Sequence, residues 1–297
     1  MRLLLPVFLA AAAMSSFAES LEGAYGNFGR LIVTQFVTAP FPHSSRADGH
    51  KYQDKFFPAD KHYSDSTVAI FIPKGCREGK RVDVVVHFHG WGNSVEGTLR
   101  QFKLIEQFVE SRKNAVLVVP EGPKNASDSS GGKLEDPEGF KRFAEELTAA
   151  LRQQGGFCKT NFTLGRIILS GHSGGYRVIS AILDHGGLSK QVREVWLFDA
   201  LYAQTEKFLT WRDQQHGRLL NIYTEQGGTK DDTEAMMALL RKRGTPFLAR
   251  TDAAVTAKEL KSGKLVFLHT DLGHNDVLEK RKTFCAFVKT SCLKDLR

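Results

Sequence analysis

Short apolar stretches rich in valine and isoleucine recur along the chain and alternate with longer amphipathic stretches. Near-continuous apolar runs of this length are typical of strands that are buried on both faces of a parallel sheet. Eight such runs predict strands, at residues 31–37, 67–72, 82–88, 115–119, 166–170, 194–198, 219–223 and 265–269.

The amphipathic stretches between these strands predict helices. They lie at residues 94–111, 136–153, 174–183, 205–212, 233–243 and 276–289. Strands that alternate with helices indicate an α/β fold, in which a mostly parallel central sheet of about eight strands carries helices on both faces. Residues 39–65 and 121–135 show no clear period, and loops of this length in a compact domain are often functional.

The first residues have the pattern of a signal peptide. Arg2 precedes an apolar run at residues 3–14, and small residues follow at positions 16 and 18. The run is too short to span a bilayer. We therefore expect residues 1–18 to be a signal peptide and residues 19–297 to be a single domain. The protein would then be secreted or periplasmic, with no membrane span.

Composition and charge narrow the class of protein. The 297 residues are 41% hydrophobic and 25% charged, as in ordinary globular proteins. The formal net charge is +8, but the basic residues are scattered among acidic ones at helical spacing. This pattern indicates solvated helix faces, so nucleic acid is not an expected partner. The sequence gives no signal for an oligomeric state.

Four cysteines are present, an even number, which in an exported chain predicts two disulfides. Cys285 and Cys292 are close in sequence, which favours a bridge between them. That bridge leaves Cys76 to pair with Cys158. No cysteine spacing indicates a zinc site.

A glycine-rich turn follows the predicted strand 166–170 directly. Residues 171–175 read Gly-His-Ser-Gly-Gly and lead into the predicted helix 174–183. Between a strand and a helix, Gly-x-Ser-x-Gly is the pattern of a nucleophile elbow, a tight turn that exposes the serine. The pattern predicts Ser173 as the nucleophile. Gly174, at the start of the helix, would donate its N–H to an oxyanion.

An activated serine needs a base, and the base needs an acid to orient it. His274 lies in a glycine-containing loop just past the last predicted strand, whereas His269 lies inside that strand. We predict His274 as the base. Asp199 directly ends the strand 194–198 and is the favoured acid. Asp231 is the alternative, at the more usual chain position, although with Glu234 three residues later it also fits a helix N-cap.

The strand 82–88 runs into His89-Gly90-Trp91-Gly92. A loop at this place supplies the second oxyanion donor, which we predict to be the Trp91 N–H, with the Gly92 N–H next. We expect His89, Gly90 and His172 to line the substrate site.

In this order, the motifs at 89–92 and 171–175, Asp199 or Asp231, and Gly273-His274 resemble the α/β-hydrolase superfamily over roughly residues 66–290. The resemblance implies a serine esterase or lipase-like hydrolase that forms an acyl-enzyme and uses no metal or organic cofactor. About twenty residues separate Asp199 from Leu219, which leaves no room for a large cap domain. The substrate would be an ester that reaches an open site, and it could be bulky or polymeric.

Three other functions are compatible with the sequence. The same triad cleaves amides, as in an amidase or a peptidase. His87, His89, His172 and Asp199 could be drawn as the zinc site of a metal hydrolase. The fold could also serve a non-catalytic protein that binds an anionic envelope polymer.

Overall fold

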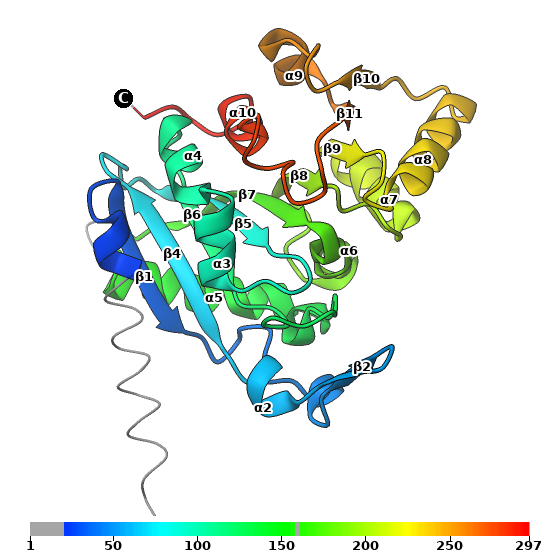
Figure 1. Ribbon diagram of the computed structural model, residues 1–297. Helices are drawn as coiled ribbons and strands as arrows, with labels where there is room; N and C mark the ends of the chain where they lie inside the picture. The colour runs from blue at the N-terminus through cyan, green and yellow to red at the C-terminus, as the bar shows by residue number, and fades with distance from the viewer. Residues whose placement is uncertain (1–20, 158–160, 297) are drawn as a thin grey trace, which may run out of the picture.

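A nine-stranded sheet forms the centre of the molecule, as the computed structural model shows (Figure 1). The structure describes residues 21–157 and 161–296. Across the sheet the order is β1 (Gly29–Gln35), β4 (Thr67–Pro73), β6 (Val116–Pro120), β5 (Arg81–Phe88), β7 (Thr163–His172), β8 (Val192–Phe198), β9 (Arg218–Thr224), β11 (Leu265–Thr270) and β10 (Leu248–Thr251). β4 is antiparallel to both of its neighbours, and the strands from β6 to β10 are all parallel.

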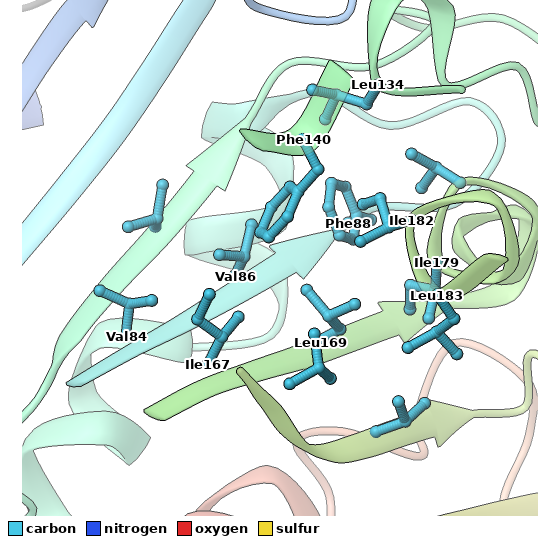
Figure 2. Packing of buried hydrophobic residues seen from close by; sticks show 14 of the residues in the cluster. Val84, Val86, Phe88, Leu134, Phe140, Ile167, Leu169, Ile179, Ile182 and Leu183 are labelled. Carbon is cyan, nitrogen blue, oxygen red and sulfur yellow. The ribbon is translucent and has the colours of Figure 1, made fainter. Parts of the chain in front are cut away.

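Helices cover both faces of the sheet (Figure 1). One face packs against α5 (Gly139–Gln153), α6 (Tyr176–His185), α7 (Thr205–Gln215) and α8 (Lys230–Lys242). The other packs against α3 (Val95–Gln101), α4 (Leu104–Glu110), α9 (Ala257–Ser262) and α10 (Thr283–Lys289). Because side chains alternate along a strand, Val84 and Val86 of β5 face the first set while Val85 faces the second. Figure 2 shows Phe88 packed beside Ile182 of α6, with Val86 and Val84 further along β5 on the same face.

The shorter elements lie mostly at the edges of this core. They are η1 (Ser44–Arg46), the hairpin of β2 (His50–Tyr52) and β3 (Lys55–Phe57), α2 (Ala59–His62), η2 (Gly132–Glu135) and η3 (Ser173–Gly175). Between β8 and β9 the chain, which is described throughout, forms α7 and no cap domain.

The predicted α/β fold is confirmed, and each of the eight predicted strands coincides with one of the nine. Three details of the prediction were wrong. β10 was missed because its four residues are mostly exposed and do not form an apolar run. The helix expected over 94–111 is broken at Lys103, whose φ is +47°. The helix expected from 276 begins at Thr283, because residues 274–281 form turns.

The predicted Cys285–Cys292 disulfide is not formed, and both residues are free thiols. Cys285 is buried in the first turn of α10, whereas Cys292 lies beyond the end of that helix and is exposed. The two thiols therefore lie in different surroundings, one packed inside the protein and one at its surface. The expected signal peptide, residues 1–18, lies outside the described residues, and so does Cys158, the expected partner of Cys76.

Over residues 21–157 and 161–296, no helix is both long and apolar enough to cross a membrane.

The start of α6 lies very close to the end of β5. A Cβ atom added at Gly175 would stand 2.7 Å from the carbonyl oxygen of Phe88. The φ of Gly175 is −63°, which any residue can adopt, so the cost of a side chain here is steric alone.

We therefore expect Gly175→Ala to lower the free energy of unfolding by about 1–3 kcal/mol, through overpacking between helix and strand. Urea denaturation measures this change. Gly23→Ala is the control, because a Cβ there meets no atom within 4 Å and the free energy should change by less than about 1 kcal/mol. Equal stability of Gly175→Ala and the wild type would contradict the close approach.

Candidate active site

Ser173 sits in a sharp turn between β7 and α6. Its φ is +51°, a left-handed conformation that costs a non-glycine residue about 1–3 kcal/mol. The turn is tight because Gly171 lies against the helix, where an added Cβ would be 2.7 Å from Ile179 Cδ1. Ser173 is partly exposed, whereas Gly174 and Gly175 are buried. The turn thus presents the serine at the carboxyl edge of the sheet, as in the predicted nucleophile elbow.

His274 and Asp199 meet at the same edge. Asp199 follows β8 and is completely buried, and His274 lies in the loop after β11. His274 Nδ1 donates a hydrogen bond of 2.6 Å to Asp199 Oδ2. The remaining ring nitrogen of His274, Nε2, is left for a reaction partner.

Asp199 is held as a carboxylate by several donors. It accepts hydrogen bonds from the Thr224 N–H at 3.1 Å, from Thr224 Oγ1 at 2.8 Å and from the Thr229 hydroxyl. Burial alone raises the pKa of this carboxyl, but the hydrogen bonds from His274, Thr229 and Thr224 outweigh burial and bring the pKa below its ordinary value. Gly227 packs directly against the carboxylate, where a side chain could not fit.

The structure therefore brings Asp199, and not Asp231, to His274. Asp231 is exposed in the first turn of α8. His269, the competing base, lies within β11 and hydrogen-bonds Glu225 Oε2 at 3.0 Å.

The loop after β5 runs against Ser173. A Cβ added at Gly90 would be 2.6 Å from Ser173 Cβ and 3.2 Å from its Oγ. The Gly92 N–H donates to the Ala126 carbonyl at 2.9 Å, whereas no acceptor among the described residues takes the Trp91 N–H. Gly174 is at the helix start, where N–H groups have no partner within the helix. Trp91 and Gly174 can therefore both donate to an oxyanion, and Gly92 cannot.

His89 does not line the substrate site as expected. Its side chain is only 1% exposed, because it points behind the loop into the protein. Nδ1 donates to the Gly90 carbonyl at 2.8 Å, and Nε2 faces both Glu121 Oε1 at 2.9 Å and the Gly122 N–H at 3.0 Å. Burial lowers the pKa of His89, but the bond to Glu121 outweighs it and the pKa is raised. We call residues 89–94 the oxyanion loop. Glu121 also accepts from the Val95 N–H, so the pair of His89 and Glu121 fixes both ends of this loop.

His172 is also buried and therefore does not line the substrate site either. Its Nε2 donates to the backbone carbonyl of His274 at 3.0 Å, and the two rings lie 4.7 Å apart. Burial and the neighbouring His274 lower the pKa of His172 to about 3, so its imidazole is neutral. It ties the loop of the base to the turn of the nucleophile.

Tyr202 completes the site and was missed in the sequence. Its hydroxyl donates to the Gly227 carbonyl at 2.6 Å, and it lies beside the Ser173 side chain. Burial and the nearby Asp199 raise the pKa of Tyr202 to about 12. No hydrogen bond joins Ser173 to His274 among the described atoms, which is common before substrate binds.

The residues drawn as a zinc site are not assembled into one. His87 Nδ1 pairs with Ser170 Oγ at 2.8 Å, and His89 faces Glu121. Within residues 21–157 and 161–296, no three His, Cys, Asp or Glu side chains form a group that could hold a metal ion.

Solved structures of other proteins resemble this chain over most of its length, and two of them are the following. FphF of Staphylococcus aureus, a fluorophosphonate-binding serine hydrolase with substrate bound, has a TM-score of 0.52 at 12% identity, over 89% of this chain and 99% of that chain. A ferulic acid esterase has a TM-score of 0.55 at 12% identity, over 89% and 98%. No family model and no curated protein sequence matches. The chain has the α/β-hydrolase fold.

The buried pair of His89 and Glu121 generates a pH-dependent prediction. Because the pKa of His89 is raised above its ordinary 6.5, the pair stabilises the fold fully below about pH 6.5 and loses that effect as the pH rises through the folded pKa. We expect Glu121→Gln to lower the pKa of His89, measured from its ring protons by NMR. At pH 6 the variant should lose roughly 3–5 kcal/mol of the free energy of unfolding, and less at pH 9.

Glu279→Gln is the control, because Glu279 pairs with Lys103 on the surface and its loss should cost less than about 1 kcal/mol. An unchanged pKa of His89 in Glu121→Gln would show that the pair does not hold the proton.

Proposed function

We propose that this protein is a serine hydrolase that cleaves carboxylic esters through an acyl-enzyme intermediate. The observation that carries the proposal is the 2.6 Å hydrogen bond from His274 to the buried Asp199, at the edge where the strained turn presents Ser173. Nucleophile, acid and base follow in the chain order of α/β-hydrolases. The two structures with a similar fold are a serine hydrolase and an esterase, which supports the choice of an ester.

In the first half of the reaction, Ser173 Oγ attacks the ester carbonyl carbon while His274 Nε2 takes the hydroxyl proton. Asp199 stabilises the imidazolium that forms. The carbonyl oxygen becomes an oxyanion, which accepts hydrogen bonds from the N–H groups of Gly174 and Trp91. The intermediate then collapses, the bond to the alcohol oxygen breaks, and the alcohol leaves with the proton from His274.

In the second half, water replaces the alcohol. His274 takes a proton from the water as its oxygen attacks the acyl carbon, and the same two N–H groups stabilise the second oxyanion. Collapse breaks the bond to Ser173 Oγ, which recovers its proton from His274 and releases the carboxylic acid. The Trp91 donor need not reorganise in either half, because the His89–Glu121 pair fixes its loop.

We also propose that the protein acts outside the cytoplasm, secreted or in the periplasm. The pattern of residues 1–18 in the sequence supports this proposal.

A fluorophosphonate probe tests whether Ser173 is activated. We expect a covalent adduct on Ser173, located by mass spectrometry of the digested protein. The adduct should be absent in Ser173→Ala and slower to form by a factor of roughly a thousand in His274→Ala, since the base is lost. Circular dichroism confirms that each variant is folded. Folded wild-type protein that forms no adduct would refute the proposal.

The two candidate acids can be separated by matched variants. Asp199→Asn removes the carboxylate that orients His274, so kcat on a 4-nitrophenyl ester should fall roughly a thousandfold or more. Asp231→Asn changes an exposed residue of α8, and kcat should stay within about twofold. The opposite result would assign the acid to Asp231.

A further inference from the structure

Two exposed aromatic side chains meet beside the candidate active site. Trp91 is 43% exposed and Tyr52 is 37% exposed, and their rings lie edge to face with centroids 4.8 Å apart. Tyr52 comes from the β2–β3 hairpin, which stands out from the body of the molecule (Figure 1), and Trp91 comes from the oxyanion loop. We call Tyr52 and Trp91 the aromatic platform.

The platform is directly next to the reaction centre. The edge of the Trp91 indole lies against Gly174, where an added Cβ would be 2.7 Å from Trp91 Cδ1. Gly174 adjoins Ser173 in the turn. A group bonded to the reacting carbonyl can therefore reach the platform.

The platform is held in place on both sides. Trp91 Nε1 donates to Ser129 Oγ at 2.7 Å, which fixes the orientation of the indole. The base of the hairpin is anchored by the buried Phe57, which packs with Phe41, Tyr63 and Ala126. Just before the hairpin, Arg46 forms two hydrogen bonds to Asp128, at 2.7 and 3.0 Å, in the segment that holds Ser129. A surface prepared in this way loses little conformational entropy when it binds a ligand.

The exposure of the platform argues against an acyl pocket. An apolar acyl chain gains most from an enclosed pocket, and here one side of the ligand would stay in water. A sugar ring suits this surface better. The apolar C–H face of the sugar can lie on the aromatic rings while its hydroxyl groups remain hydrated or bind polar groups. Such groups are present at the tip of the hairpin and on the face of Tyr52, where Gln53, Asp54 and Lys55 are all exposed.

We propose that the aromatic platform binds a sugar ring in the alcohol part of the substrate, so that the ester is one of a carbohydrate. This inference rests on the proposed esterase function. In this proposal Tyr52 determines which esters bind, and it takes no part in the reaction steps.

The chain supplies a matched control for Tyr52. Phe56 is also aromatic, lies in the same hairpin and is 57% exposed. It pairs with Lys51, whereas Tyr52 pairs with Lys55, so Phe56 and Tyr52 lie on opposite faces of the hairpin. Loss of Phe56 changes the exposed apolar area without touching the platform.

The kinetic test compares acetyl esters of cellobiose and of xylobiose with methyl acetate, so that the acyl group is constant. We expect kcat/KM of the wild type to be at least tenfold higher for one of the sugar esters. Tyr52→Ala should lower that value at least fivefold, mainly through KM, and leave methyl acetate within twofold. Phe56→Ala should leave both substrates within twofold. No preference for either sugar ester, or equal losses on both kinds of ester in Tyr52→Ala, would overturn the inference.

A binding test does not depend on catalysis. Of the three tryptophans only Trp91 is exposed, since Trp196 and Trp211 are buried, so a change in tryptophan fluorescence reports the platform. Cellohexaose or xylohexaose should quench the fluorescence of Ser173→Ala. The double variant with Tyr52→Ala should bind at least fivefold more weakly, and the double variant with Phe56→Ala should bind as well as Ser173→Ala.

The two proposals fail in different ways. If Ser173 forms no adduct and no ester is cleaved while the hexasaccharides still bind, the proposed esterase function is wrong. If the enzyme cleaves methyl acetate but neither hexasaccharide binds, the sugar platform alone is wrong.

Discussion

The hydrogen bond between the buried Asp199 carboxylate and His274 joins the ends of two strands that are not neighbours in the sheet. β8 supplies the acid, β11 leads to the base, and β9 lies between them. A carboxylate without solvent is costly unless donors surround it, and here Thr224 at the end of β9 and Thr229 shortly after it provide them. The geometry of the site thus depends on the order of the strands as much as on the identity of the three residues.

The loop after β5, which supplies the Trp91 N–H, is also held in place by buried side chains. The loop of Gly90 and Trp91 follows β5, and its position is set by His89 and by Glu121 at the end of β6. His172 connects the turn of Ser173 to the loop of His274, because it directly precedes Ser173 and donates to the His274 carbonyl. Two of the residues expected to touch substrate are therefore internal supports. Their neighbours Trp91 and Ser173 form the surface.

Much of this arrangement could be predicted from the sequence, because its main signals are local. Buried strands appear as short runs of valine and isoleucine, and Ser173, Asp199 and His274 each come within a few residues of such a run. The missed residues depend on contacts between distant segments. Glu121 directly follows a strand, as Asp199 does, and that signal could have identified it. Its partner could not be identified, because the order of β5 and β6 in the sheet is not visible in the chain.

Other signals were misleading or absent. Cys285 lies inside α10 and Cys292 lies beyond its end, and closeness in sequence did not bring the two thiols together. Asp231 and Asp199 looked similar as strand-end acids, and only burial beside His274 separates them. Tyr202 gave no signal at all, because its place near Ser173 arises from the path of the chain after β8.

The short connection between β8 and β9 has a consequence for how an enzyme of this shape would respond to aggregated substrate. A hydrolase with a mobile cover gains activity when a lipid surface holds that cover open. This chain forms only α7 at that position, so no cover inserted there has to be displaced. Its rate should rise smoothly with substrate concentration, with no jump where substrate molecules begin to form micelles. Such behaviour suits substrates that are dissolved in water or hydrated at the surface of a polymer.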